Sequence, residues 1–139
     1  LEPSFKIYCQ QVIDNAKTIA NEMKSKGYDL VSDGTDTHLV LIDLSSISVS
    51  GKKAEKSLES AGITVNKNMV PFDTKSPMVT SGIRIGTPAM TTRGMKNNEM
   101  KIIVNFIDKV LKNPDDEQLL IDIKNNVKDF CSKFPLYED

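Results

Sequence analysis

The 139-residue sequence lacks several features that would point to particular classes of protein. It has no excess of basic residues, because 18 Lys and Arg face 19 Asp and Glu for a formal net charge of -1. A balanced charge gives no electrostatic footprint for nucleic acid or for an anionic membrane. The sequence also lacks an uninterrupted run of about 20 apolar residues, which a membrane-spanning helix needs. We therefore expect no nucleic-acid partner and no membrane partner.

Cysteine is scarce, and the acidic residues near the predicted turns do not suggest a metal site. Cys9 and Cys131 lie at opposite ends of the chain and form no CxxC motif. We interpret them as buried, reduced thiols of a cytoplasmic protein, although two cysteines also allow one disulfide. Asp33 and Asp36 are typical turn formers, and Asp43 has no second ligand at a useful spacing. No metal site is predicted.

The start of the chain lacks a targeting segment. It opens with LEPSFKIYCQQ, without an initiator Met and without a basic segment followed by an apolar one. We therefore predict neither a signal peptide nor a transit peptide. The length suits one domain with a single core. We expect residues 1–139 to form one domain that has been cut from a longer protein.

Apolar periodicity predicts helices that alternate with short strands. The helical spacing covers residues 4–26, 51–61, 100–111 and 120–134. The β-prone runs are 28–31, 38–44, 63–65 and 83–85, and turn formers at 32–36 make the first two a hairpin. The run 38–44 is apolar almost throughout, which predicts a strand covered on both faces. This order predicts an α+β fold, an α/β sandwich in which helices cover a small, mostly antiparallel sheet.

Residues 66–82 contain no periodic pattern, and such long irregular segments in compact domains usually have a function. The segment leads into Arg84, which lies between Ile83 and Ile85. Strand alternation sends Arg84 to the face opposite the two isoleucines. A guanidinium offers two parallel N–H donors that match a carboxylate. We predict that Arg84 binds a carboxylate ligand, with an ion pair to a structural Asp or Glu as the alternative.

Four strings of the sequence resemble one enzyme family. They are TSGIRIGTPAMTTRGM at 80–95, TVNKN at 64–68, YDLVSDGTDTHLVLIDL at 28–44 and SPMVTSG at 76–82. Together they closely resemble the C-terminal domain of serine hydroxymethyltransferases, and the surrounding helices fit in order. The resemblance implies a pyridoxal-phosphate enzyme of the aspartate-aminotransferase fold, with residues 1–139 as its small domain. Met90 replaces the family's usual Leu or Ile, a change of similar volume.

The resemblance also implies roles for individual residues. Arg84 would bind the α-carboxylate of serine or glycine. Asn68, Ser76, Pro77 and Met78 would line the pocket for tetrahydrofolate. The lysine that holds pyridoxal phosphate and the groups that act on the substrate belong to the family's large domain, which this chain lacks. We therefore expect no catalytic residue here and no activity from the chain alone.

The implied partners follow from the reaction of the family, which interconverts serine and tetrahydrofolate with glycine and methylene-tetrahydrofolate. The small molecules are therefore serine, glycine and tetrahydrofolate, and pyridoxal phosphate is the cofactor. The large domain of the same enzyme is the expected protein partner, and the parent enzyme is expected to be a homodimer in the cytoplasm. An apolar patch on the first helix is expected where the large domain packs.

Several residues and two other functions remain open. His38 is interpreted as a packing or capping residue, Arg93 as a structural ion pair or a contact near the site, and Lys67 and Lys75 as solvated loop lysines. Another enzyme of the same fold, such as an aminotransferase, would also use Arg84, but is not expected to carry TVNKN and SPM together. The other alternative is a module that binds amino acids without chemistry.

Overall fold

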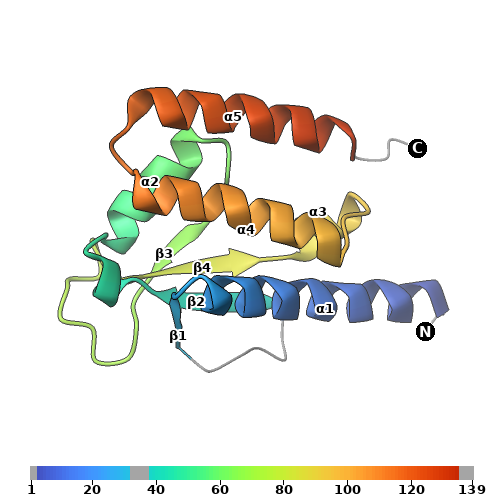
Figure 1. The fold of residues 1–139 in the computed structure, drawn as a ribbon. Helices are drawn as coiled ribbons and strands as arrows, with labels where there is room; N and C mark the ends of the chain where they lie inside the picture. The colour runs from blue at the N-terminus through green and yellow to red at the C-terminus, as the bar shows by residue number, and fades with distance from the viewer. Residues whose placement is uncertain (1–2, 32–37, 135–139) are drawn as a thin grey trace.

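The computed structural model describes residues 3–31 and 38–134. The elements follow the predicted order of helices and short strands (Figure 1). They are α1 (Pro3–Ser25), β1 (Asp29–Leu30), β2 (Leu39–Asp43), the short 3-10 helix η1 (Ser45–Ile47), α2 (Gly51–Ser60), β3 (Asn66–Asn68), β4 (Gly82–Gly86), α3 (Pro88–Thr92), α4 (Asn97–Lys112) and α5 (Glu117–Ser132). The predicted α+β class is confirmed.

The described strands form one antiparallel sheet in the order β1-β2-β4-β3. β4 is therefore a central strand, paired with β2 on one side and with β3 on the other. In this register Arg84 lies opposite Leu41 of β2 and opposite Asn66 of β3. The predicted pairing of the first two strands is confirmed, and the connecting turn at 32–36 lies outside the described residues.

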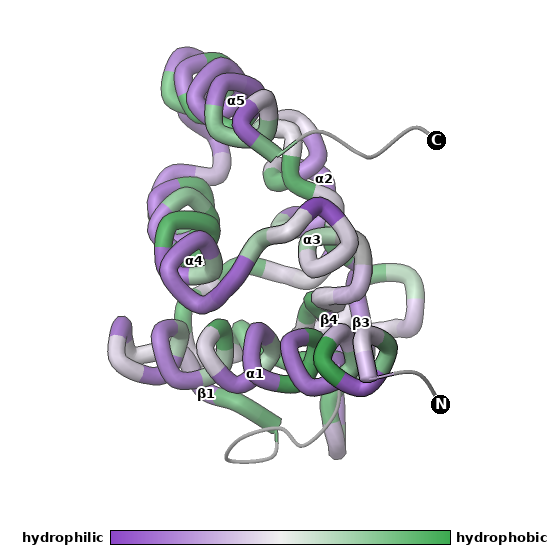
Figure 2. The backbone as a smooth tube through the Cα atoms, turned by 90° about the vertical axis from the view of Figure 1, so that its right-hand side faces the viewer, coloured by the Kyte–Doolittle hydropathy of each residue, from purple (hydrophilic) through white to green (hydrophobic). Residues whose placement is uncertain are grey.

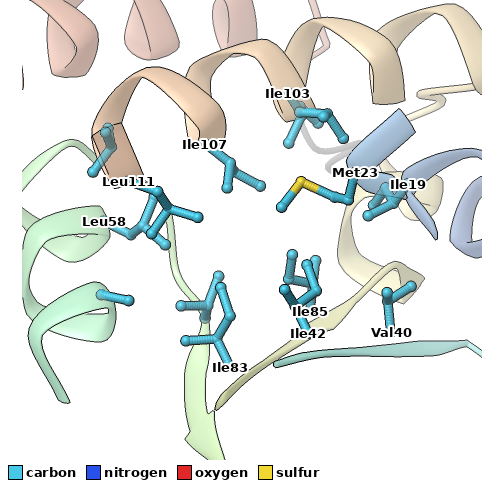
Figure 3. Packing of buried hydrophobic residues seen from close by; sticks show 14 of the residues in the cluster. Ile19, Met23, Val40, Ile42, Leu58, Ile83, Ile85, Ile103, Ile107 and Leu111 are labelled. Atoms are coloured by element: carbon cyan, nitrogen blue, oxygen red, sulfur yellow. The ribbon is translucent and has the colours of Figure 1, made fainter. Parts of the chain in front are cut away.

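The helices cover one face of this sheet. Figure 2 shows α4 lying between α1 and α5, in agreement with the contacts that α4 makes with both helices. α5 contacts α2 and α4. In Figure 3 the side chains of Ile103 and Ile107 lie on the side of α4 that faces Ile42 and Ile85 of the sheet. The core therefore lies between the sheet and the layer formed by α1, α2 and α4.

The predicted apolar face of the helix at 100–111 is confirmed. Its six members, all buried in the structure, are Met100, Ile103, Val104, Ile107, Val110 and Leu111. α2 begins after Ser50, whose Oγ accepts a hydrogen bond from the Lys53 N–H at 3.1 Å, as the capping pattern predicted. Local periodicity and capping therefore predicted these helices correctly.

Two predictions about the strands were wrong. In β2, only Val40 and Ile42 are buried, whereas Leu39, Leu41 and Asp43 are half-buried, so the helices cover one face of this strand and not both. The strand predicted at 63–65 lies at Asn66–Asn68 instead. This edge strand has the polar sequence NKN, and its asparagines lie on the open face of the sheet. It therefore lacks the alternation of apolar residues by which a strand is usually predicted.

Gly82 begins β4 at a point where three segments approach closely. A Cβ atom at this position would lie 2.8 Å from Val70 Cγ1 and 2.9 Å from the carbonyl oxygens of both Asn68 and Ile42. Two of these neighbours are backbone atoms of the adjacent strands, which cannot move without breaking the pairing. Glycine is therefore required for the close packing of β2, β3 and β4 just before Arg84.

The first helix exposes apolar side chains near its start. Phe5 is 50% and Ile7 is 70% exposed, while the second half of α1 buries Ala16, Ile19 and Met23 in the core. The exposed pair lies on the helix where an apolar patch was predicted. None of the helices among residues 3–31 and 38–134 combines the length and the apolar character that crossing a membrane requires.

Candidate functional site

Arg84 lies on the face of the sheet that the helices leave open. Its neighbours Ile83 and Ile85 are buried beneath the helices, whereas Arg84 is exposed. The predicted alternation of β4 is therefore confirmed. The strand is held on both sides by backbone pairing, which fixes where the Arg84 side chain starts.

The guanidinium of Arg84 forms no ion pair and no side-chain hydrogen bond with any residue that the structure describes. Asp43 lies on the same face of the neighbouring strand, but its Oδ1 accepts hydrogen bonds from the backbone N–H and the hydroxyl of Ser45, at 2.9 and 2.6 Å. The alternative prediction was an ion pair between Arg84 and a structural Asp or Glu. The described part of the chain contains no carboxylate that is paired with Arg84 in this way.

Two asparagines share the open face with Arg84. Asn66 lies directly opposite Arg84, and Asn68 lies opposite Gly82, two residue pairs further along β3. The side chain of Asn68 donates a hydrogen bond to the carbonyl oxygen of Met69 at 3.0 Å. The structure therefore brings Asn68 and Arg84 to neighbouring strands of one surface. Asn66 was not predicted as a site residue, although alternation from Asn68 places both side chains on the same face.

The other predicted pocket residues lie in the loop between β3 and β4, which spans residues 69–81. Ser76, Pro77 and Met78 form its exposed turn, and 71% of the surface of Met78 is accessible. The carbonyl oxygen of Ser76 closes this turn by accepting hydrogen bonds from Val79 at 3.0 Å and Thr80 at 2.8 Å. Figure 1 shows the loop beyond the end of the sheet, so these residues are separate from the strand positions of Asn68 and Arg84.

Asp73 organises this loop, although it was not predicted as a site residue. Its carboxylate accepts hydrogen bonds from the backbone N–H groups of Lys75, Ser81 and Val70 and from the Ser81 hydroxyl. The bonds from Lys75 and Ser81 lower the pKa of Asp73 to about 2. The role of Asp73 was hard to predict from the sequence. An Asp whose side chain accepts a hydrogen bond from the residue two positions later is common in ordinary turns.

The family model of serine hydroxymethyltransferase matches residues 1–107 of the chain. The match contains the open face with Arg84 and Asn68, the whole 69–81 loop and most of α4. The chain belongs to the serine hydroxymethyltransferase family. The family consists of transferases that depend on pyridoxal phosphate. α5 follows the matched residues.

Two lysines of this serine hydroxymethyltransferase chain were interpreted as solvated loop residues. Lys67 instead lies in β3, where its N–H donates to Glu55 Oε2 at 2.8 Å and its Nζ lies 3.8 Å from Glu55 Oε1. Because it alternates with the asparagines, Lys67 faces α2 and not Arg84. Lys75 is an exposed loop residue, as expected, and its Nζ lies 3.3 Å from the Ser81 hydroxyl.

Arg93 connects α3 with the end of α5. Its Nη1 donates a hydrogen bond to the carbonyl oxygen of Phe134 at 3.2 Å, which supports a structural role. Arg93 also lines a cavity of about 270 Å³, together with apolar side chains of α4 and α5. The cavity reaches Ile85, which faces the helices, so it lies on the other side of β4 from Arg84.

His38, Cys9 and Cys131 take no part in the open face. His38 is exposed before β2, and its carbonyl oxygen accepts the Thr87 N–H at 3.1 Å. Cys9 and Cys131 are free thiols, and both are half-buried, so the prediction that they are buried was wrong. Among the residues that the structure describes, no group of three or more His, Cys, Asp and Glu is arranged to hold a metal ion.

Phe72 has an unfavourable backbone conformation and a fully exposed side chain. Its φ of +58° lies in the left-handed region, which costs a residue with a bulky side chain roughly 1 kcal/mol and which Asn adopts more readily. We expect Phe72→Asn to raise the free energy of unfolding of the chain by about 0.5 to 1 kcal/mol, measured in urea. Met69→Asn is the control, because Met69 is also exposed but has no positive φ, and it should give no such gain.

Proposed function

We propose that this chain is the C-terminal small domain of a serine hydroxymethyltransferase and that Arg84 binds the α-carboxylate of serine or glycine. The observation that carries the proposal is the exposed Arg84 on the open face, without a partner among the described residues. An unpaired guanidinium on a paired central strand offers a fixed, bidentate site for a carboxylate. The family match supports serine and glycine as the source of that carboxylate.

Pyridoxal phosphate needs a lysine for covalent attachment, and the described strands place none on the Arg84 face, since Lys67 points toward Glu55. We propose that the large domain of the same enzyme holds the cofactor, and that this chain alone is inactive. When bound, pyridoxal phosphate serves as the electron sink for breaking bonds at the α-carbon of an amino acid.

The contribution of this chain is then to bind and orient the substrate. A carboxylate held by both nitrogens of the Arg84 fork cannot rotate freely, so the rest of the amino acid is restricted to a narrow range of orientations. Holding a reactant in one orientation is a large part of what an enzyme contributes to a reaction rate. In the proposed enzyme, this orientation selects which bond at the α-carbon is broken.

We further propose that Asn68, Ser76, Pro77 and Met78 contact tetrahydrofolate, the acceptor of the hydroxymethyl carbon. The amide of Asn68 provides donors and acceptors for a polar ring edge, and exposed Met78 provides a polarizable apolar surface. Dimerisation of the parent enzyme and its location in the cytoplasm belong to the same proposal.

Titration of tetrahydrofolate into the full-length enzyme by calorimetry tests the folate assignment. We expect Asn68→Ala to weaken binding by roughly 10-fold, the effect of losing one or two hydrogen bonds. Asn126→Ala is the matched control, because Asn126 is an exposed asparagine on α5, and it should leave the affinity unchanged. A wild-type enzyme that binds no folate would instead indicate another pyridoxal-phosphate enzyme of the same fold.

A further inference from the structure

We propose that Asp73 is a positioning residue for tetrahydrofolate, acting by fixing the 69–81 loop that presents Ser76, Pro77 and Met78. The inference rests on the proposed folate site and adds a residue that does not itself touch the ligand. The observation behind the proposal is that the carboxylate of Asp73 accepts hydrogen bonds from residues at both ends of the loop.

The hydrogen bonds to Asp73 connect residues that are far apart along the loop. Oδ2 accepts the N–H of Ser81 at 2.8 Å and that of Val70 at 3.3 Å, which joins the last residue of the loop to its second. Oδ1 accepts the N–H of Lys75 at 2.9 Å and the hydroxyl of Ser81 at 2.7 Å. The carboxylate therefore closes the base of the loop.

The far side of the same turn is fixed by the first residues of α2. The N–H of Gly51 donates to the Thr80 carbonyl oxygen at 3.1 Å, and the N–H of Lys52 donates to that of Val79 at 2.8 Å. Gly51 has no room for a side chain, because a Cβ atom would clash with the Thr80 hydroxyl oxygen and with the Gly82 carbonyl oxygen. α2 and Asp73 thus hold the turn at 76–80 from two directions.

This bonding matters because the loop has little hydrophobic core of its own. Of the residues from 69 to 81, only Val70, Thr80 and Ser81 are buried, and the turn itself is exposed. A loop without a core keeps one conformation only if hydrogen bonds replace the missing packing. A ligand that binds a loop already in its bound conformation does not have to order it, which raises affinity.

The two ligands of the proposed enzyme should respond differently to the loss of Asp73. Arg84 lies in β4, which is paired with β2 and β3 along its length, so its position does not depend on the loop. Ser76, Pro77 and Met78 have no such support. Loosening the loop should therefore weaken the binding of tetrahydrofolate and leave serine binding unchanged.

The experiment compares Asp73→Asn with wild type in the full-length enzyme. The amide keeps the size of the carboxylate but places an N–H₂ group against donors that need an acceptor. We expect the Kd and KM for tetrahydrofolate to rise roughly 10-fold or more and the Kd for serine to stay within about twofold. Hydrogen exchange should accelerate at the amides of Val70, Lys75 and Ser81.

Asp129→Asn is the matched control, because Asp129 is exposed on α5 and its side chain forms no hydrogen bond in the described structure. If Asp73→Asn does not fold, Ser81→Ala carries the test. It removes the hydroxyl bond to Asp73 Oδ1 and the longer bond from Lys75 Nζ but keeps the backbone bonds to Asp73, so a smaller rise in the folate Kd is expected. A variant whose loop amides exchange faster while its folate Kd is unchanged would overturn the inference.

The result for Asn68→Ala separates this inference from the proposed function. If Asn68→Ala weakens folate binding and Asp73→Asn does not, the folate site stands and the positioning role of Asp73 is wrong. If neither variant changes folate binding, the proposed folate site is wrong, and the inference about Asp73 fails with it. An equal loss of serine and folate binding in Asp73→Asn would also contradict a selective role in the loop.

Discussion

Arg84→Ala in the full-length enzyme should weaken serine binding by about 2 to 5 kcal/mol, or roughly 30-fold to several thousand-fold. Arg84 is exposed on the open face and has no partner among the described residues, so the variant leaves none of the described carboxylates unpaired. The loss would therefore reflect the missing ligand contact and not damage to the fold. Calorimetric titration of serine measures this effect, and the same holds for glycine.

The control variants for Arg84 distinguish the effect of its bidentate geometry from the effect of its positive charge. Arg84→Lys keeps the positive charge but loses the bidentate geometry, so serine affinity should fall to an intermediate value. Lys101→Ala removes an exposed cation from α4 and should leave serine affinity unchanged. The pyridoxal phosphate content of Arg84→Ala, read from absorbance, should equal that of wild type. Unchanged serine affinity in Arg84→Ala would refute the role of Arg84.

The parts of the fold that could be predicted from the sequence are those in which the pattern is local. The buried face of α4 follows from the spacing of its apolar residues, because every third or fourth side chain meets the same neighbours. The exposure of Arg84 between two buried isoleucines follows from strand alternation in the same way. Neither prediction needs to know what the segment packs against.

The parts that could not be predicted depend on distant segments. β3 is polar and short, and it becomes a strand because β4 offers a free edge and because Glu55 of α2 accepts the N–H of Lys67. The open face of β2 could not be predicted either, because the sequence of a strand does not reveal whether helices cover one face of the sheet or both. Asp73 was missed because its partners at Val70 and Ser81 are set by the path of the loop.

Asn15 is the clearest buried polar group that the periodic pattern did not predict. It is fully buried in α1, among residues of the apolar face. Its Nδ2 donates to the Thr91 hydroxyl at 2.9 Å and to the Met95 carbonyl oxygen at 3.0 Å, and its Oδ1 accepts from Gln11 at 2.8 Å. Asn15 therefore attaches α1 to the segment that follows β4. β4 is the strand that carries Arg84.

Asn15→Ala should lower the free energy of unfolding by about 2 to 4 kcal/mol, because it leaves buried polar groups unpaired and creates a cavity. Urea unfolding of the chain measures the change. Asn15→Asp keeps the shape but turns a carboxylate oxygen toward the Met95 carbonyl, so a comparable loss would show that hydrogen bonding dominates over packing. Asn126→Ala, at an exposed position of α5, should change stability by less than about 0.5 kcal/mol. A similarly small effect of Asn15→Ala would mean that the apolar contacts of α1 with α4 suffice to attach the helix, and that the polar contacts to Thr91 and Met95 contribute little.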